Sequence, residues 1–368
     1  MLEALYHTRQ KRILDAVALR QPDRIPMVLE YSGFAACATG TTMAHFLKSP
    51  LNALETMIEA YALIGGGDAI NYGTFWPYGL CSDYLAKVRV PGVDLPEDAM
   101  WQVVESERMQ REDYDRILEM GWPEFFRHYL QTRIFDDVPS AYLPPNLPKL
   151  DVRGAWRRIG VPVLSGGDVT TPYELLCGAR SLPAFAADMI QIPDKVTAVM
   201  DAIVPHLAGV SIAKARKKGY PLVWVGGWQS APCLLSPTMW NRFVWPYLNR
   251  LIHEVTASGL VALLHLDSNW TRELKRFLEL PKGRCIVALD GETDIFEAKN
   301  VLGDHLCIMG DVPASMLFLE TPKVVSTYCR KLIREIGPTG FILQSGCDIP
   351  ANARLENVQA MVAAVSES

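Results

Sequence analysis

The stretch Val261-Ala262-Leu263-Leu264-His265-Leu266-Asp267-Ser268-Asn269 decides the fold. An apolar run of strand-forming residues ends abruptly in polar side chains that bind metals. Continuous apolar runs are typical of buried strands in parallel sheets, and in a barrel of such strands the chemistry lies where each strand ends. His265 and Asp267 are two residues apart, so they point to one face of an extended strand. The pair predicts half of a metal site or, alternatively, a hydrogen bond within a loop.

Similar apolar runs recur along the chain and alternate with helical segments. This alternation predicts an α/β fold, and a repeat of about eight units favours a (β/α)8 TIM barrel over a doubly wound sheet. No G-x-G-x-x-G motif follows the first run, and residues 80–150 have room for one more strand. The other predicted strands are Ile25–Glu30, Asp68–Tyr72, Pro162–Asp168, Leu222–Val225, Ile286–Leu289, Leu306–Met309 and Phe341–Gln344.

A bare barrel needs about 250 residues, which leaves roughly a hundred for an N-terminal helical extension and an insertion. We therefore expect a single domain over residues 1–368. The predicted helices that matter below are Leu2–Leu19, Met43–Leu63, Arg108–Arg133, Asp194–Lys218 and Trp270–Leu278, the last capped by Asn269.

Composition narrows the class of protein. The net charge is −5, and the basic residues form only two clusters, Lys214–Lys218 and Arg153/Arg157/Arg158, which we interpret as solvated helix faces. A nucleic-acid partner is therefore not expected. Eight cysteines without a CxxC pair suit reduced thiols. The charged N-terminus and the lack of a run of about 20 apolar residues favour a cytoplasmic protein outside the membrane.

Polar residues gather at the predicted strand ends. An open catalytic zinc site uses three protein ligands from His, Cys and carboxylate, and His265, Asp267 and Cys347 supply such a set. Each residue also has a structural alternative: Cys347 as a buried thiol, Asp290 and Asp311 as helix caps, and Glu30 as a partner of Arg24. The strand ends supply Glu30, Asn71, Asp168, Gln229, His265, Asp267, Asp290, Asp311 and Cys347.

An ordered set of motifs over residues 155–366 resembles the uroporphyrinogen decarboxylase superfamily, whose fold is a (β/α)8 barrel. The N-terminal third is similar more weakly. The motifs are Ser236-Pro237 with Phe243 and Pro246-Tyr247-Leu248, His265-x-Asp267-x-Asn269, Leu289-Asp290, Met309-Gly310-Asp311-Val312, and Gly346-Cys347-Asp348-Ile349-Pro350.

Within that superfamily the chain departs from the decarboxylases. Their N-terminal arginine motif for substrate carboxylates corresponds here to Glu30–Phe34, which contains no arginine, and their late G-H-G histidine corresponds to Cys347. The other branch comprises corrinoid-dependent methyltransferases, including methylcobamide:coenzyme M enzymes, which bind zinc through His-x-Cys and a late cysteine. His265 and Cys347 match that pattern, and Asp267 stands in place of the first cysteine.

The resemblance implies Zn2+ as cofactor and a partner protein that carries a corrinoid (cobalamin). A carboxylate in place of a thiolate makes the ion harder and better matched to oxygen. We therefore expect transfer of a methyl group from a small donor, preferably a methoxylated aromatic (O-demethylation), to the cobalt of the corrinoid protein. The expected substrate-binding residues are Phe34, Trp76, Tyr78, Trp228 and Gln229, and a fourth ligand or proton donor is expected among Glu30, Glu174 and Asp290.

Several alternatives remain open at this point. The methyl donor is alternatively a methyl halide or a methylamine. The enzyme could also transfer the methyl group in the other direction, from a methyl-corrinoid to a thiol or folate acceptor. A metal-free decarboxylase (lyase) acting on a smaller acid is the alternative from another enzyme class, and a non-catalytic binding relative is the third. Metal content separates the first group from the others.

Overall fold

A closed barrel of parallel strands forms the centre of the molecule. The computed structural model describes residues 1–143 and 146–366. In that part of the chain β5 to β10 form one sheet in sequence order, and β1 pairs with β2. Parallel bridges Met27–Leu343 and Ile70–Val163 join the two sheets and close the barrel. The barrel strands are β1 Val28–Leu29, β2 Ala69–Ile70, β5 Ser165–Thr170, β6 Leu222–Gly227, β7 Val261–Leu266, β8 Cys285–Leu289, β9 Cys307–Val312 and β10 Phe341–Ser345.

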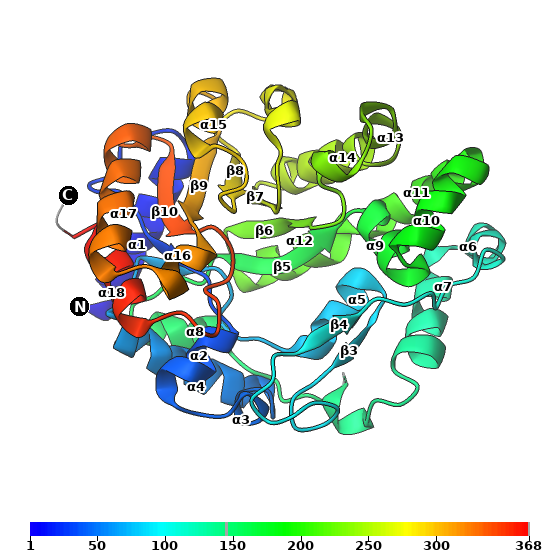
Figure 1. Ribbon diagram of the computed structural model, residues 1–368, viewed down its shortest axis with the longest axis horizontal. Coiled ribbons are helices and arrows are strands. Elements are labelled where there is room, and N and C mark those ends of the chain that lie inside the picture. Colours follow the sequence, from blue (N-terminus) through cyan, green and yellow to red (C-terminus); the bar gives the residue numbers. More distant parts are fainter. Residues whose placement is uncertain (144–145, 367–368) are drawn as a thin grey trace.

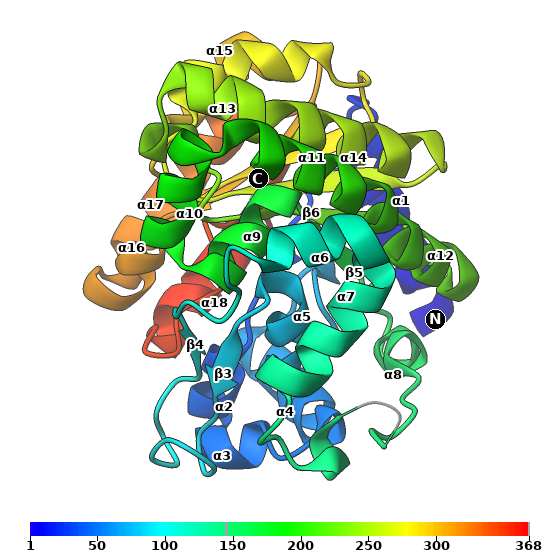
Figure 2. The same ribbon diagram turned by 90° about the vertical axis from the view of Figure 1, so that its right-hand side faces the viewer.

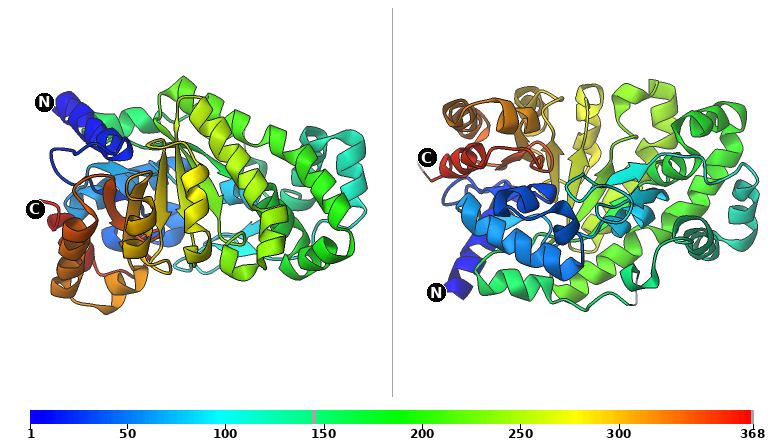
Figure 3. Two further views of the ribbon diagram at one scale, coloured as in Figure 1. Left: turned by 90° about the horizontal axis from the view of Figure 1, so that it is seen from above. Right: turned by 60° about the horizontal axis from the view of Figure 1, so that its bottom comes forward.

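Helices surround these strands on the outside (Figures 1 and 3). The α-helices are α1 Leu2–Val17, α2 Gly33–Thr39, α3 Met43–Phe46, α4 Pro50–Ile64, α5 Leu80–Tyr84, α6 Asp113–Met120, α7 Trp122–Tyr129, α8 Val152–Arg158, α9 Pro172–Arg180, α10 Leu182–Gln191, α11 Pro193–Ile203, α12 Ala208–Lys218, α13 Pro237–Phe243, α14 Trp245–Ala257, α15 Ile295–Leu302, α16 Ala314–Leu319, α17 Pro322–Ile336 and α18 Leu355–Ala363. Short 3-10 or π turns are η1 Pro77–Gly79, η2 Leu130–Ile134, η3 Ser140–Tyr142, η4 Val204–His206, η5 Pro232–Leu234 and η6 Thr271–Glu279. The predicted (β/α)8 barrel is confirmed.

Two separate apolar cores follow from the alternation of side chains along each strand. On β7, Val261 and Leu263 face the barrel interior, whereas Ala262 and Leu264 pack against the outer helices. Helix α1 closes the interior at the amino-terminal ends of the strands with Ile13, Ala16 and Val17. The amino-terminal end of the barrel is therefore filled with apolar side chains. The polar strand ends lie at the opposite end, which we call the mouth.

The described residues between 80 and 150 contain no barrel strand, so the prediction of a further strand there was wrong. The runs named from the sequence already supply all eight strands. Within the described part of this segment, β3 Lys87–Arg89 and β4 Gln102–Val104 form an antiparallel hairpin. The helix predicted over Arg108–Arg133 is divided into α6 and α7, because Gly121 between them has a φ of +83°.

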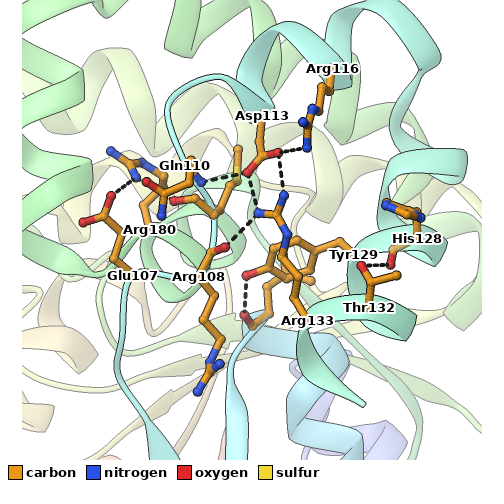
Figure 4. Close-up of polar contacts among 12 residues, drawn as sticks. Glu107, Arg108, Gln110, Asp113, Arg116, His128, Tyr129, Thr132, Arg133 and Arg180 are labelled. Atoms are coloured by element: carbon orange, nitrogen blue, oxygen red, sulfur yellow. Dashed lines mark hydrogen bonds and ion pairs between the residues drawn. The ribbon is translucent and has the colours of Figure 1, made fainter. Parts of the chain in front are cut away.

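A carboxylate clasp holds this inserted segment together. Asp113 is 1% exposed. It accepts hydrogen bonds from Nη1 of Arg133 at 2.6 Å, from Nη1 of Arg116 at 3.1 Å and from the backbone N–H of Gln110 at 2.7 Å. Figure 4 shows Asp113 between the two arginines. A buried carboxylate of this kind is stable only because its lone pairs are satisfied.

Three other helices differ from their predicted extents. Met43–Leu63 is divided into α3 and α4, with Ser49 capping α4 and Pro50 in its first turn. Asp194–Lys218 is interrupted at η4, where Pro205 lacks a backbone N–H. The segment after Asn269 is the 3-10 turn η6 rather than an α-helix, and Asn269 bonds to the backbone N–H of Thr271 at 3.1 Å.

One stretch, Pro193–Lys218, is long and apolar enough to cross a membrane by length and composition. Its α12 part packs against β5 as a barrel helix and ends in Arg216, Lys217 and Lys218. Core helices of barrels often have this composition, so the stretch is weak support for a membrane span.

Candidate metal centre at the barrel mouth

His265, Asp267 and Cys347 lie together at the mouth. One ligand atom from each residue lies within 4.8 Å of the other two. Nε2 of His265 is 3.2 Å from Oδ1 of Asp267 and 3.7 Å from Sγ of Cys347. His265 continues the inward-facing row of β7, and Asp267 follows it two residues later on the same side. An imidazole, a carboxylate and a thiol in this arrangement fit the donor set of an open zinc site.

The loop after β10 brings Cys347 to this place. The backbone N–H of Gly346 donates to the carbonyl of Val312 at 2.8 Å, and that of Ile349 donates to the carbonyl of Glu30 at 2.9 Å. A Cβ added at Gly346 would lie 2.3 Å from the carbonyl oxygen of Asp290. Only glycine lets the loop pass so close to the end of β8. Cys347 is therefore fixed between strands β9 and β1.

Opposing effects act on the ionisation of the cluster. Burial alone lowers the pKa of His265, but the hydrogen bonds to Asp267 and Cys347 and the charge of Glu30 raise it well above the usual value. Burial raises the pKa of Cys347, and the bond to His265 opposes this rise. The His265 Nδ1 atom is buried and has no hydrogen-bond partner among the described residues. The acids beside His265 therefore favour the protonated form of its imidazole.

Glu30 forms a second acidic group beside the cluster. Its Oε2 atom accepts a hydrogen bond from Nδ2 of Asn71 at 2.5 Å and from Nε2 of Gln344 at 2.8 Å. All three residues end adjacent strands of the barrel. Because both amides bind Oε2, the carboxylate is held in one orientation and Oε1 remains available to a ligand. The sequence placed Asn71 at a strand end but did not assign Gln344 to the site.

Glu174 lies fully buried on the other side of the mouth. Thr171 caps α9 and accepts from the backbone N–H of Glu174, which is the start of a capping box. The Glu174 carboxylate instead binds the backbone N–H groups of Gln229 at 3.3 Å and Ser230 at 2.8 Å. Burial raises the pKa of Glu174 to about 7. A carboxyl group with this pKa can hold or release a proton near neutral pH.

Two glycines of β6 make room for this arrangement. A Cβ added at Gly227 would lie 2.2 Å from Cδ of Glu174, and one added at Gly226 would lie 2.6 Å from the carbonyl oxygen of His265. No side chain larger than hydrogen fits at either position without moving the site. The glycines therefore set the distance between strand β6 and its neighbours.

Asp290 and Asp311 are engaged in holding the structure at the mouth. Asp290 accepts from the backbone N–H groups of Ser268 at 2.6 Å and Glu292 at 2.9 Å, which joins the loops after β7 and β8. Asp311 accepts from the hydroxyl of Tyr328 at 2.7 Å. Both carboxylate oxygens of Asp290 therefore already accept backbone hydrogen bonds beside the cluster, whereas the sequence analysis expected this residue as a metal ligand or a proton donor.

The five expected substrate-binding residues do not form one pocket. Phe34 is 1% exposed and packs edge-on against Tyr31 in the core. Trp76 and Tyr78 line a groove of about 660 Å³ in the inserted segment. Trp228 is 38% exposed, and its ring lies 4.0 Å from that of Tyr84.

Gln229 is the one expected substrate residue in direct contact with a candidate acid. Its backbone N–H donates to Glu174, and its side-chain Oε1 atom is buried and finds no partner among the residues that the structure describes. The aromatic pair Trp228 and Tyr84 adjoins it in sequence and space. Tyr84 was missed by sequence reasoning because it lies in an irregular segment without a strand end.

Asp348 was also missed as a site residue, although it lies inside a motif that the sequence analysis singled out. It accepts a hydrogen bond from the Ser32 hydroxyl, and its Oδ1 atom is buried and has no partner in the described part of the chain. Burial raises the pKa of Asp348 to about 7, and the charge of Glu30 acts in the same direction. The signal available from the sequence was only its position next to Cys347.

A barrel with an acidic, His- and Cys-containing mouth defines the class of protein as a (β/α)8-barrel enzyme. A model of the family described as uroporphyrinogen decarboxylase (URO-D) matches residues 154–368, more than half of the chain. The chain belongs to the URO-D family.

Relatives and solved structures agree with this assignment. A uroporphyrinogen decarboxylase of Geobacter metallireducens is 23% identical over 96% of this chain and 97% of that protein. One from Coxiella burnetii is 28% identical over 56% of this chain and 57% of that protein. A methyltransferase from Methanosarcina mazei has a TM-score of 0.72 at 17% identity and covers 98% of both chains. This structural likeness shows the shared fold.

Proposed function

We propose that the protein is a zinc-dependent methyltransferase of a corrinoid system. The observation that carries the proposal is the cluster of His265, Asp267 and Cys347, whose ligand atoms lie within 4.8 Å of one another at the mouth. The structural likeness to a protein described as a methyltransferase supports it. In this reading Nε2 of His265, a carboxylate oxygen of Asp267 and Sγ of Cys347 hold the ion. Zinc held there supplies Lewis acidity toward an oxygen atom.

The remaining side chains of the mouth position the methyl donor and its proton. Glu30 is oriented by Asn71 and Gln344, and its free oxygen serves as a fourth ligand or as an acceptor for the donor. Glu174, with a pKa of about 7, supplies a proton to the departing oxygen. Protonation matters because a bare alkoxide or phenoxide is a poor leaving group.

The favoured donor is a methoxylated aromatic, and the acceptor is the Co(I) corrinoid of a partner protein. Trp228 and Tyr84 offer aromatic faces beside Gln229, which suits stacking on an aromatic ring. The carboxylate of Asp267 in place of a thiolate favours oxygen over sulfur as the substrate atom at the metal. Transfer from methyl-corrinoid to a thiol or a folate is the alternative within the same class.

Metal content and methyl transfer test the proposal together. The protein as purified, without added metal or chelator, is compared with His265→Ala and Cys347→Ala by elemental analysis and circular dichroism. We expect near-stoichiometric zinc in the wild type, its loss in both variants and an unchanged fold. Cys307→Ala is the matched control, because it removes a buried thiol from the barrel interior away from the mouth and should keep the zinc.

The second measurement follows demethylation of a methoxylated aromatic in the presence of a Co(I) corrinoid protein. Activity that depends on both intact ligands supports the proposal. Absence of zinc from the wild type, with no uptake on addition, would overturn it.

A decarboxylase is the second candidate, because full-length relatives such as that of Geobacter metallireducens are described as uroporphyrinogen decarboxylases. The acids of the mouth argue against a substrate with many carboxylates. The charges of Glu30 and Asp267 raise the pKa values of His265 and Cys347, and that of Glu30 also raises the pKa of Asp348. Release of carbon dioxide from uroporphyrinogen by the metal-free protein would favour this candidate.

A further inference from the structure

Residues from both basic clusters of the sequence, Arg153 and Arg157 from one and Lys218 from the other, line one hollow on the surface. Figure 2 shows both α8 and α12 near the N-terminus. Between them is a hollow of about 590 Å³. Its charged lining consists of Lys149, Arg153, Arg157, Lys218 and the single acid Asp151, with Tyr220 as an aromatic wall.

Arg153 lines this hollow and forms no ion pair with any described residue. Its guanidinium carbon lies 5.7 Å from the centre of the Tyr6 ring, and a Cβ added at Gly219 would lie 3.3 Å from its Nη1 atom. Its Nε atom is buried and makes no hydrogen bond within the described residues. A buried guanidinium N–H without an acceptor is unfavourable. Arg153 therefore adds an unneutralised positive charge to the lining of the hollow.

The neighbouring charges do not neutralise Arg153. Arg157 pairs with Glu3, and the carboxylate of Asp151 caps α8 by accepting from the backbone N–H of Gly154 at 3.0 Å. In the described structure no ion pair engages Lys149 or Lys218. The hollow therefore has an excess of positive charge.

The electrostatics of single helix ends do not explain why so many basic side chains gather around one hollow. Cations stabilise the carboxyl end of a helix, which explains the basic last turns of α8 and α12 taken one at a time. Bringing both ends and Lys149 around one hollow adds repulsion between like charges. An anion bound between them removes that repulsion.

We propose that this hollow is a binding site for a ligand that carries a phosphate group. Guanidinium and ammonium groups converging on one point are the usual donors to phosphate. The volume exceeds that of a single phosphate and falls in the range of small-molecule sites, so the ligand also contacts Tyr220. Tyr220 precedes β6, so the site lies at the amino-terminal end of the barrel, opposite the metal cluster.

Titration calorimetry with inorganic phosphate and with pyrophosphate at physiological salt tests the proposal. We expect saturable binding of at least one of the two probes by the full-length protein. The double variant Lys149→Gln/Lys218→Gln should weaken that binding by about ten-fold or more, since each lost charge-assisted hydrogen bond removes this order of affinity. Both lysines are chosen because neither holds the fold through an ion pair.

The matched control is Lys275→Gln/Lys282→Gln, which removes the same charge from two exposed positions elsewhere. It should bind the probe as the wild type does. Equal weakening in both double variants would mean screening by net charge and would overturn the proposal, as would absence of saturable binding in the wild type. Zinc content should be the same in all three proteins, so this result stands apart from that of the metal site.

Discussion

At the scale of single residues, Asp267 is the position that separates this site from the thiolate-rich pattern it resembles. Its carboxylate bonds to His265, so it acts both as a candidate ligand and as the group that orients the imidazole. We expect Asp267→Ala to lower zinc affinity by more than the about 10–100-fold that loss of an orienting partner causes. Asp267→Cys should restore zinc binding but not demethylation of an ether.

Competition with a chelator measures the affinities of both variants, and the methyl-transfer assay measures the activity. If Asp267→Ala binds zinc as tightly as the wild type, Asp267 is not a ligand. In that case the carboxylate only orients His265.

Glu174 predicts a pH dependence of stability. Its pKa is raised from 4.5 to about 7 in the folded protein, so the folded state holds this proton more tightly than the unfolded state. The stability it contributes is present at acid pH and is lost as pH rises from about 4.5 to 7, by up to about 3 kcal/mol. Glu174→Gln removes the titration and should reduce the fall.

Urea unfolding at pH 5 and at pH 7.5 compares the two proteins. Asp348 and Asp311 also have raised pKa values and are common to both, so the difference between the proteins isolates Glu174. An identical fall in both would show that Glu174 does not titrate in this range.

At the scale of elements, the Asp113 clasp predicts how the inserted segment opens. Asp113→Ala leaves Arg133 without its partner and should lower the free energy of unfolding by about 3 kcal/mol. Because the clasp lies within the insertion, zinc content should not change. Limited trypsin digestion should cut the variant first between residues 105 and 135, and a wild-type digestion pattern would contradict this account.

The sequence predicted the elements best where the pattern is strongest. The run Val261–Leu266 was expected as a strand with His265 and Asp267 on one face, and the structure agrees. Helix boundaries failed where a single residue decides them, as at Pro205 and Gly121. The extra strand expected in residues 80–150 was wrong because the eight runs named elsewhere in the sequence already complete the barrel.

The candidate site could be predicted only in part. The residue types at strand ends and the late cysteine motif brought His265, Asp267 and Cys347 into one hypothesis. The aromatic residues failed to converge because Phe34 and Trp76 belong to segments whose packing depends on distant contacts. Partners such as Gln344 and Ser32 could not be found, since an amide or a hydroxyl carries no pattern of its own.

At the scale of the whole molecule, the barrel separates stability from chemistry. Helix α1 fills the amino-terminal end with Ile13, Ala16 and Val17, whereas the ionisable groups gather at the mouth. Ile13 is 0% exposed, so Ile13→Ala should lower the free energy of unfolding by about 2–5 kcal/mol. Denaturant unfolding measures this loss.

Zinc content and methyl transfer of Ile13→Ala at low temperature should equal those of the wild type. Loss of zinc from a variant that is still folded would show that the two ends of the barrel are coupled. In that case the division between stability and chemistry would not hold.

The glycines at the end of β6 have a consequence for how new specificities arise in this scaffold. A first methyl group at Gly226 or Gly227 already collides with the backbone of His265 or the carboxyl of Glu174. A single substitution of either glycine displaces His265 or Glu174 before the new side chain can contact a substrate, so evolution cannot change the substrate range through these two positions. Adaptation to another donor is confined to neighbouring loop positions such as Trp228, and a mutant library aimed at altered substrate range should keep both glycines constant.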